Sequence, residues 1–400
     1  MTDTLVPRIT TLPTLRHPDR PFDPPPELAE IRERHPLVRM TYPDGHDGWL
    51  ATGYDGCRAV LADRRCSSRY ELMHLPMEME GAPPELPPAP VGDLTGIDAP
   101  EHTRLRRPLV GYFTVRRMRA LTDRVEEIAA EHLDAMQHDG APADLVPAFA
   151  RPIPALTICE LLGVPYADRD TFQRHVFTMT SHSSTPEEMG AAMGALHEYL
   201  LGLVQAKRAH PAEDVLSSLT ETDLTDDELA GVGAFLLGAG LDTTANMIAL
   251  GTFALLRNPH QLDVLRSDPD VVEPAVEELM RYLTVGHTNI RAALEDVEVE
   301  GELIRAGETV TIAMGAGNRD PRRYPDPDVL DLRRGAPGHL TLGHGIHQCL
   351  GQQLARVEMR VAFPALLTRF PTLRLDCDPA DVPLRPDANI YGVHHLPIAW

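Results

Sequence analysis

The feature that most constrains the fold is a long apolar segment between Asp223 and Leu256, DLTDDELAGVGAFLLGAGLDTTANMIALGTFALL. Thr225 and Glu228 have the spacing of a capping box, in which the two side chains satisfy free N–H groups at a helix start. The pattern therefore predicts a helix from Asp226 to about Leu256. Because apolar residues lie on nearly all sides of this helix, we expect it to be central, with the rest of the chain packed around it.

The middle of this helix carries polar residues at a weak point. Gly238 and Gly240 lower its helical stability, and an acid and two alcohols follow at Asp242, Thr243 and Thr244. A threonine hydroxyl can bond the carbonyl one turn back, which together with the glycines permits a local bulge. A buried acid beside a buried alcohol is costly unless it serves a purpose. Taken alone, the segment favours a structural explanation over a functional one, namely a helix–helix contact that needs small residues.

A cysteine with a distinctive setting, Cys349, lies in the segment LTLGHGIHQCLGQQLARVEMR. It is flanked by glycines, which allow tight turns and close approach to a bulky partner, at Gly343, Gly345 and Gly351. The run from Gln352 onward predicts a helix, with Leu354, Val357 and Ala362 on one apolar face. Cys349 therefore lies at a helix N-terminus, where free N–H groups and the helix dipole favour a thiolate. A thiolate there can be a nucleophile, a zinc ligand or a haem-iron ligand.

Composition limits the class of protein. The 400 residues, 43% of them apolar, can bury a large core, and we expect a single domain over residues 1–400. Five cysteines without a CxxC pair argue against a disulfide framework or a four-cysteine zinc site. A net charge of -22 disfavours nucleic acid and anionic membranes as partners. The N-terminal residues resemble neither a signal peptide nor a membrane span, so we expect a soluble, cytoplasmic protein.

Periodicity along the chain predicts a mostly helical fold with a minor strand component. Trp49 to Asp63 reads as a strand that leads into a helix, and Val297 to Met314 alternates as strands do. Met73 to Gly96 contains too many prolines for regular structure, and a loop of that length is usually functional or disordered. Helical spacing is found in three further segments, 101–137, 145–162 (with breaks expected at Pro152 and Pro154) and 189–209.

Two shorter patterns are individually weak. Glu278 and Arg281 stand three residues apart and so share a helix face. His102 and Arg106, four residues apart, present two cationic donors on one side of a helix. A surface ion pair and a solvated helix face would explain them equally well.

In this order and spacing the four patterns resemble the cytochrome P450 superfamily of haem-thiolate monooxygenases, and in particular its soluble bacterial members. The family's cysteine loop, Phe-Gly-x-Gly-x-His-x-Cys-x-Gly, is matched at five positions, with Leu342 in place of the phenylalanine. The matched residues are Gly343, Gly345, His347, Cys349 and Gly351. The resemblance continues through AGNRDP and GVHHLPIAW and covers nearly the whole chain. The single lysine, Lys207, among many arginines suggests a GC-rich genome such as that of an actinomycete.

The resemblance implies an α+β fold, mostly α, that buries haem b (iron protoporphyrin IX) between the long helix and the cysteine loop. Cys349 would be the axial iron ligand, whose thiolate favours O–O cleavage. The family has an aromatic residue where this chain has Leu342. Its absence would affect the redox tuning of the haem iron rather than the ligation of the iron by Cys349. The resemblance assigns further cofactor contacts, several of them to the haem propionates, to His102, Arg106, Ala239, Arg291, Gly343, His347 and Gly351.

The same resemblance assigns roles in catalysis and in the scaffold. Asp242 and Thr243 would deliver protons for a monooxygenase reaction that uses O2 and two electrons from a ferredoxin and its reductase. Glu278 and Arg281, completed by Arg334, would form a buried structural network.

The resemblance also suggests where a small-molecule substrate would bind. Its contacts would come from 73–96, 172–184, 236–244 and 285–290, and near 390–391. The most specific candidates are Val285, His287, Asn289, Ile290 and Tyr391. The polar run His287, Thr288 and Asn289 either bonds strand ends or recognises amide or hydroxyl groups of a peptide-derived or polyketide secondary metabolite.

Three alternatives remain open at this point. The enzyme could catalyse oxidative coupling of a natural product, or the protein could be a haem-thiolate sensor or carrier without turnover, which the retained Asp242 and Thr243 argue against. A non-haem protein could use Cys349 as a nucleophile or, with His344 and His347, as a zinc ligand. The zinc site would lack a fourth ligand and would leave the other patterns unexplained.

The electron donor raises a question of charge, because an acidic ferredoxin would be repelled by a protein of net charge -22. Arginines nevertheless gather on the two segments that the family places beside the thiolate, and such a face would steer an acidic partner. These predicted docking residues are Arg104, Arg107, Arg116, Arg117, Arg356 and Arg360.

Overall fold

The predicted long helix forms the axis of the molecule. The computed structural model describes residues 8–78, 85–180, 185–386 and 390–400, and in it α10 spans Asp226–Arg257. The capping box of Thr225 and Glu228 is present at its start. Within the described residues α10 alone is long and apolar enough to cross a membrane, but most of that apolar stretch is buried inside the protein. It is therefore a core helix, as its all-round apolar character predicts.

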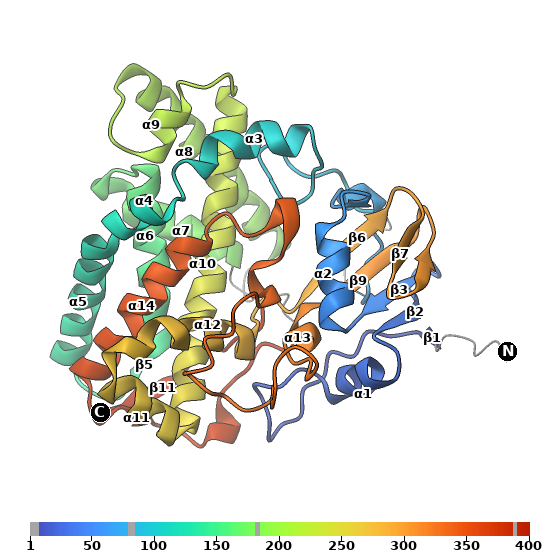
Figure 1. Cartoon of the computed structure of the whole chain (residues 1–400). Helices are drawn as coiled ribbons and strands as arrows, with labels where there is room; N and C mark the ends of the chain where they lie inside the picture. The colour runs from blue at the N-terminus through green and yellow to red at the C-terminus, as the bar shows by residue number, and fades with distance from the viewer. Residues whose placement is uncertain (1–7, 79–84, 181–184, 387–389) are drawn as a thin grey trace, which may run out of the picture.

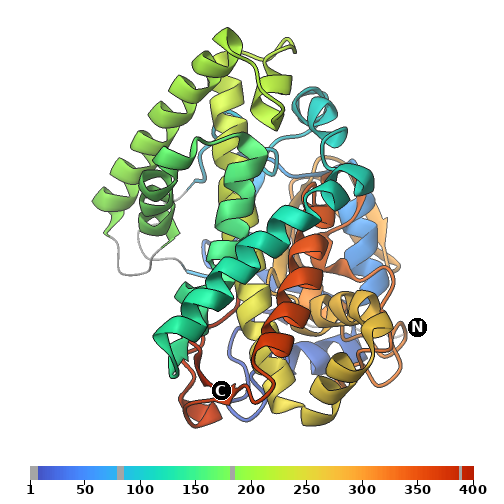
Figure 2. The same cartoon turned by 90° about the vertical axis from the view of Figure 1, so that its left-hand side faces the viewer.

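Helices surround α10 on several sides (Figure 1). It packs against α6 (Pro152–Leu162), α8 (Pro186–Ala209), α12 (Val272–Leu283) and α14 (Gln352–Arg369). Figure 2 shows α5 (Thr122–Asp139), in teal, lying diagonally beside α14, with which it packs. The other described α-helices are α1 (Pro26–Arg34), α2 (Tyr54–Ala62), α3 (Glu101–Val110), α4 (Val115–Ala120), α7 (Arg169–Thr180), α9 (Val215–Leu219), α11 (Pro259–Ser267) and α13 (Met314–Gly317).

A mixed sheet lies beside the helices, on the right of Figure 1. It has six strands in the order β1-β2-β3-β9-β6-β4, where β3 and β9 are parallel and β6 and β9 antiparallel. Two small antiparallel sheets have the order β10-β11-β5 and β7-β8. The strands are β1 (Arg8–Ile9), β2 (Leu37–Thr41), β3 (Asp47–Ala51), β4 (Cys66–Ser67), β5 (Ala143–Asp144), β6 (Thr288–Ala293), β7 (Val297–Val299), β8 (Glu302–Ile304), β9 (Thr309–Ala313), β10 (Arg374–Leu375) and β11 (Pro397–Ala399). The predicted fold class, mostly α with a minor β part, is confirmed.

The local predictions largely agree with these elements. The strand and helix expected over Trp49 to Asp63 are β3 and α2, and the alternating stretch after Val297 forms β7, β8 and β9. Of the two breaks expected in 145–162, the one at Pro152 is found, because a short π-helix, Val146–Ala150, ends just before α6 begins there. The break expected at Pro154 is absent, because α6 continues through it from its first turn. In the described part of 73–96 no helix or strand is formed.

An ionic network around the fully buried pair Glu278 and Arg281 joins α12 to the segment that leads into the cysteine loop. Arg281 donates from Nε and Nη2 to the two carboxylate oxygens of Glu278 at 2.7 and 2.8 Å, and both side chains are 0% exposed. Arg334 Nε donates to Glu278 Oε1 at 3.2 Å, as the resemblance implied. Arg281 Nη1 also donates to the carbonyls of Asn318 and Pro327 at 2.9 and 2.8 Å. Every atom of the Arg281 fork therefore has a partner, which a buried charge requires.

We expect Arg281→Met to lower the free energy of unfolding by about 3–5 kcal/mol, because Glu278 would stay buried with only part of its compensation. Urea denaturation of the purified protein measures this. Arg305→Met is the matched control, because Arg305 pairs with Asp296 at the surface and its loss should leave the urea midpoint unchanged. Equal shifts for the two variants would contradict the structural role of the network.

Candidate active site

The cysteine loop takes a backbone course that needs glycine. Gly343 and Gly345 have positive φ angles of 67° and 76°, and a Cβ on Gly345 would lie 2.6 Å from the Leu61 carbonyl oxygen. Side chains other than hydrogen are therefore excluded at Gly345 by both strain and contact. The Cys349 N–H donates to the Leu342 carbonyl at 2.8 Å, which folds the loop back on itself before α14 begins at Gln352.

The sulfur of Cys349 lies at a large interior cavity of about 720 Å³, within the usual range for small-molecule sites. Burial raises the pKa of the Cys349 thiol, while the Gly351 N–H and the charges of Arg106 and Arg356 act in the opposite direction. This raised pKa is the opposite of what the sequence led us to expect for Cys349, because the desolvation of the thiolate outweighs the effect of the helix N-terminus. A metal cation at the sulfur would reverse this balance, since a coordinating thiol is deprotonated.

The cavity collects most of the residues that the sequence singled out. It lies between α10, the cysteine loop and the first residues of β6, with an apolar wall that includes Met73, Met77, Phe113, Ile158 and Met247. The predicted site residues that line it are Arg106, Ala239, Thr243, Val285, His287, Asn289, Ile290, Arg291, Gly343, His347, Cys349 and Gly351. Asp242, His102 and Tyr391 do not line it.

Four nitrogen-bearing side chains form a group at one edge, which we call the cationic cluster: His102 and Arg291 are buried, and Arg106 and His347 are half-buried. The rings of His102 and His347 lie 4.2 Å apart, and Nε2 of each is buried without a hydrogen-bond partner among the described residues. Burial is the main cause that lowers the pKa of His102 to about 4, of His347 to about 3 and of Arg291 to about 10. Burial also lowers the pKa of Arg106.

The cationic cluster has an acid nearby, Asp98, but the arginines of the cluster make no ion pair within the described residues. In the described chain no carboxylate forms an ion pair with Arg106 or Arg291; Arg106 donates to the Gln348 carbonyl, and Arg291 to Asn289 Oδ1 and the Ile290 carbonyl. The nearby Asp98 is engaged by Ser67 Oγ at 2.6 Å and by the Ser68 N–H at 2.9 Å. Largely buried guanidinium groups without an ion-pair partner, here Arg106 and Arg291, favour an anionic ligand. The cluster, and the unpartnered imidazole nitrogens in particular, therefore fits a cofactor that carries carboxylates.

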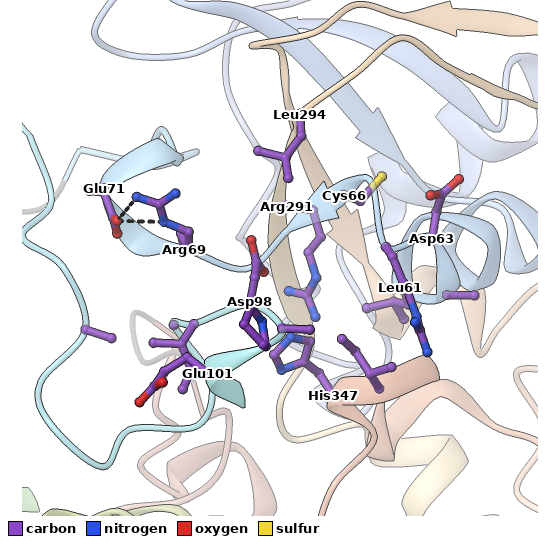
Figure 3. A pocket seen from close by; sticks show the side chains of 18 of the residues that line it. Leu61, Asp63, Cys66, Arg69, Glu71, Asp98, Glu101, Arg291, Leu294 and His347 are labelled. Atoms are coloured by element: carbon purple, nitrogen blue, oxygen red, sulfur yellow. Dashed lines mark hydrogen bonds and ion pairs between the residues drawn. The ribbon is translucent and has the colours of Figure 1, made fainter. Parts of the chain in front are cut away.

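A second pocket, of about 620 Å³, opens on the outer side of the cationic cluster. Figure 3 shows Arg291, Asp98 and His347 grouped near the middle of the view, with Glu101 to their lower left. Arg291, His347 and Leu61 line both this pocket and the interior cavity. These three side chains form a common wall between the two spaces.

The two residues of the acid–alcohol pair have different surroundings. Thr243 lines the cavity, and its hydroxyl donates to the Ala239 carbonyl at 2.8 Å, the bond one turn back that the sequence allows. The permitted bulge is not formed, because α10 stays α-helical through this segment. Asp242 points away from the cavity, and Arg385 Nη1 donates to both of its oxygens at 3.0 and 3.1 Å. Arg385 was missed by the sequence reasoning because nothing local marks a partner 143 residues away.

Glu358 was also missed. It lines the cavity from α14 and is only 2% exposed. It stands four residues after Leu354 and four before Ala362, both buried, so the helical period alone places this acid on the apolar face. This helical periodicity was the sequence signal that could have identified Glu358.

Tyr391 corrects a prediction about the substrate pocket. Its side chain is buried outside the cavity, and its hydroxyl donates to the Pro21 carbonyl at 2.7 Å. The guanidinium of Arg16 lies over its ring at 3.6 Å. Tyr391 therefore holds the N-terminal arm, and its neighbour Ile390 lines the cavity instead.

The predicted docking arginines are only partly available. Arg104 binds Glu101 and Glu228, Arg356 binds Glu277, and Arg360 binds Glu273 at 3.2 Å. Arg107, Arg116 and Arg117 are exposed, and Arg117 lies over the ring of Tyr112. Arg104, Arg356 and Arg360 are therefore tied to acids, which the sequence did not reveal.

The zinc alternative finds no ligand set in this arrangement. Over the described ranges, no three His, Cys, Asp or Glu side chains gather in a way that could hold a metal ion. His344 and His347 thus do not converge with Cys349 on one point.

Comparisons with known proteins agree with the geometry. Residues 170–394 match the family model described as Cytochrome P450. Cytochrome P450 105C1 of a Streptomyces species is 49% identical over 95% of this chain and 96% of its own length. Pentalenic acid synthase of Streptomyces avermitilis is 43% identical over 95% of each chain. The crystal structure of CYP105P1 in complex with filipin I matches with a TM-score of 0.90 and 40% identity over 98% of each chain. The chain thus belongs to the cytochrome P450 family, and it is a haem-iron monooxygenase.

Proposed function

We propose that this monooxygenase carries haem b and oxidises a secondary metabolite with dioxygen and two electrons from a ferredoxin and its reductase. The observation that supports this most directly is the cavity, which brings the Cys349 sulfur, Thr243 and the arginines of the cationic cluster around one space. We further propose a cytoplasmic location, in keeping with the use of α10 as a core helix.

Cys349 would hold the iron, and the cationic cluster would hold the two propionates. When bound, the haem supplies the activation of dioxygen, which electron donation from a thiolate ligand favours. Arg106 and Arg291 offer charge-assisted donors to carboxylates, and Nε2 of His102 and of His347 would gain the partner that each lacks within the described protein. Ala239, Gly343 and Gly351 line the same space without bulky side chains, which leaves room for a flat macrocycle.

Thr243 would position water for proton delivery on the α10 side of the cavity. Its hydrogen is donated to the Ala239 carbonyl, so its oxygen is left to accept a hydrogen bond from water in the cavity. Asp242 is the neighbouring acid, but both of its oxygens accept from Arg385 Nη1, and it does not line the cavity.

The substrate would lie against the methionine-rich wall, because unbranched thioether side chains adapt to irregular apolar shapes. His287 Nδ1 and Thr288 Oγ1 bond each other at 2.7 Å, and Asn289 Oδ1 accepts from the Ile290 N–H at 2.9 Å. These local bonds support the strand-end role more than substrate recognition for this polar run. Relatives named for pentalenic acid and solved with filipin I support a secondary metabolite as the substrate.

Replacing Cys349 tests the central assignment. Cys349→Ala should abolish turnover and the red-shifted Soret band of the reduced, carbon monoxide-bound protein, because that band requires thiolate ligation. Cys377→Ala is the control, since Cys377 is distant in sequence and does not line the cavity. A Cys349→Ala protein that kept the thiolate-type spectrum would refute the ligand assignment.

Thr243→Ala should keep haem and substrate binding but lower the product formed per electron pair by about tenfold or more, as loss of positioned proton transfer does. The measurement compares product with consumed reductant and released peroxide. Thr252→Ala is a matched control, because Thr252 makes the same bond one turn back, to Ile248 at 2.8 Å, but lies outside the cavity. Unchanged coupling in Thr243→Ala would remove the hydroxyl from the mechanism.

The exposed arginines Arg107, Arg116 and Arg117 are the proposed ferredoxin contact. Arg116→Glu should slow reduction by an acidic ferredoxin about tenfold at low salt, with substrate affinity unchanged. The unmodified protein should be reduced more slowly as salt rises, because screening weakens steering. Arg20→Glu, an equal charge change on the exposed N-terminal arm, should have little effect. Reduction rates that change neither with salt nor with Arg116→Glu would point to another docking surface.

A further inference from the structure

Two histidines outside the active-site cavity stack face to face. His46 lies in the turn between β2 and β3, and His74 lies near the start of the proline-rich loop 73–96. Their ring centroids are 3.6 Å apart, with an angle of 3° between the planes. The ring of Tyr42 meets both edge-on, with centroid distances of 5.7 and 6.2 Å. Because Asp44 of the same turn bonds with His74, we call His46, His74 and Asp44 the histidine clamp.

The hydrogen bonds of the clamp fix which ring nitrogens carry hydrogen. The Thr309 N–H at the start of β9 donates to His46 Nε2 at 3.2 Å, so this nitrogen carries no proton. Asp44 accepts from the His46 N–H at 3.0 Å and bonds with His74 Nδ1, where the carboxylate can only accept and the imidazole donates. His46 is therefore a neutral acceptor, whereas the bond between His74 and Asp44 persists whether or not His74 is charged.

The clamp adjoins the methionine-rich wall of the active-site cavity. Met73 and Leu75, the two neighbours of His74 in sequence, line the cavity, and so does Met77. Within the run 73–77, MHLPM, His74 is the only strongly polar side chain. The side-chain hydrogen bond that ties this run to the sheet is therefore the one made by His74.

The far end of the same loop is held in a different way. Gly92 approaches α10 so closely that a Cβ on it would lie 2.3 Å from the carbonyl carbon of Gly231. This backbone contact involves no titratable group, so acid should leave it in place. Of the two contacts, only the one at His74 can respond to a proton.

The charges around His46 keep it neutral. Burial is the main cause that lowers the pKa of His46, and the neighbouring His74 acts in the same direction. The acids that act in the opposite direction are each engaged already: Asp44 by His74, Glu308 by Arg39 and the Trp49 indole, and Asp47 by Arg8. A proton on His46 would thus face a second imidazole at 3.6 Å and the Thr309 N–H, with no free carboxylate among the described residues to compensate it.

We propose that the histidine clamp holds the methionine-rich wall of the cavity in place and releases it when His46 takes up a proton from solvent. Protonation turns Nε2 from an acceptor into a donor, so the bond from Thr309 is lost and a cation then faces His74. Neither histidine lines the cavity, so both are positioning residues. The link to substrate rests on the proposed function of the cavity, whereas the clamp itself does not.

The direction of the pH effect follows from the lowered pKa of His46. A histidine whose pKa is lower in the closed clamp than in free solution favours closure at pH values above its ordinary pKa of about 6.5. This contribution is lost as the pH falls through the lowered value. We therefore expect the wall to loosen on the acid side and to stay in place at neutral and alkaline pH.

Hydroxyl-radical footprinting of the haem-loaded protein reads the wall without any substrate. Oxidation of Met73 and Met77, relative to Met247 on α10, should rise about threefold between about pH 7.5 and about pH 5. His46→Gln offers an acceptor to Thr309 but cannot be protonated, so its oxidation should stay at the neutral wild-type level at both pH values. His138→Gln, in the exposed last turn of α5, is the control and should keep the acid response.

His46→Ala separates the clamp from other acid effects. It removes the ring and the acceptor together, so the oxidation of Met73 and Met77 should be raised at both pH values. Oxidation equal to that of the neutral wild type would show that the clamp does not hold the wall. An acid response retained in His46→Gln would show that another group senses the proton, and either result overturns the proposal.

Biphenyl, an apolar probe that does not titrate, tests the link to substrate binding. Its dissociation constant, measured from the spin-state change of the ferric haem, should rise about tenfold between about pH 7.5 and about pH 5 in the wild type and stay constant in His46→Gln. A constant that does not change with pH in the wild type would overturn the positioning role. A protein without the thiolate-type carbon monoxide band would end the proposed function, whereas footprinting would still report on the clamp.

Discussion

The buried pairing of Glu278 with Arg281 is the interaction on which the position of the cysteine loop depends. Arg281 fixes the Asn318 carbonyl, and the Asn318 side chain in turn accepts from the Leu340 N–H at 2.7 Å and donates to Thr341 Oγ1 at 2.9 Å. The chain of bonds runs from α12 to the first residues of the loop that carries Cys349. Because a buried guanidinium has few alternative arrangements, this network fixes the loop relative to α12, which packs against α10.

The same low-polarity interior explains the chemistry of the cavity. Burial disfavours the charged form of every ionisable group there, which lowers the pKa of His102 and His347 and raises that of Cys349 and Glu358. A metal cation and two carboxylates would offset most of these costs at once, the cation at the sulfur and the carboxylates at the cationic cluster. Neither the cation nor the carboxylates would offset the burial of Glu358, so Glu358 stays protonated.

The sequence allowed the backbone framework to be predicted better than the side-chain partners. The capping box located the first residue of α10, and the apolar run located its last residue to within one position, since both signals are local. The ion pairs of Arg360 with Glu273 and of Asp242 with Arg385 could not be predicted, because they join residues that only the fold brings together. Tyr391 was misplaced for a related reason: Ile390 and Tyr391 are neighbours, and which of the two faces the cavity depends on a bridge between Gly286 and Ile390.

The order of strands in the large sheet has a consequence for biosynthesis. β3 pairs with β9, and the Trp49 indole donates to Glu308 at 2.7 Å across 259 residues of sequence. Tyr391 and Arg319 then tie the N-terminal arm to the last part of the chain. Contacts between residues so distant in sequence form late in folding, because the entropy lost on closing the intervening loop must be overcome first. During synthesis, the N-terminal strands therefore stay unpaired on one edge until the ribosome has made most of the protein. The cofactor can be enclosed only after synthesis is nearly complete.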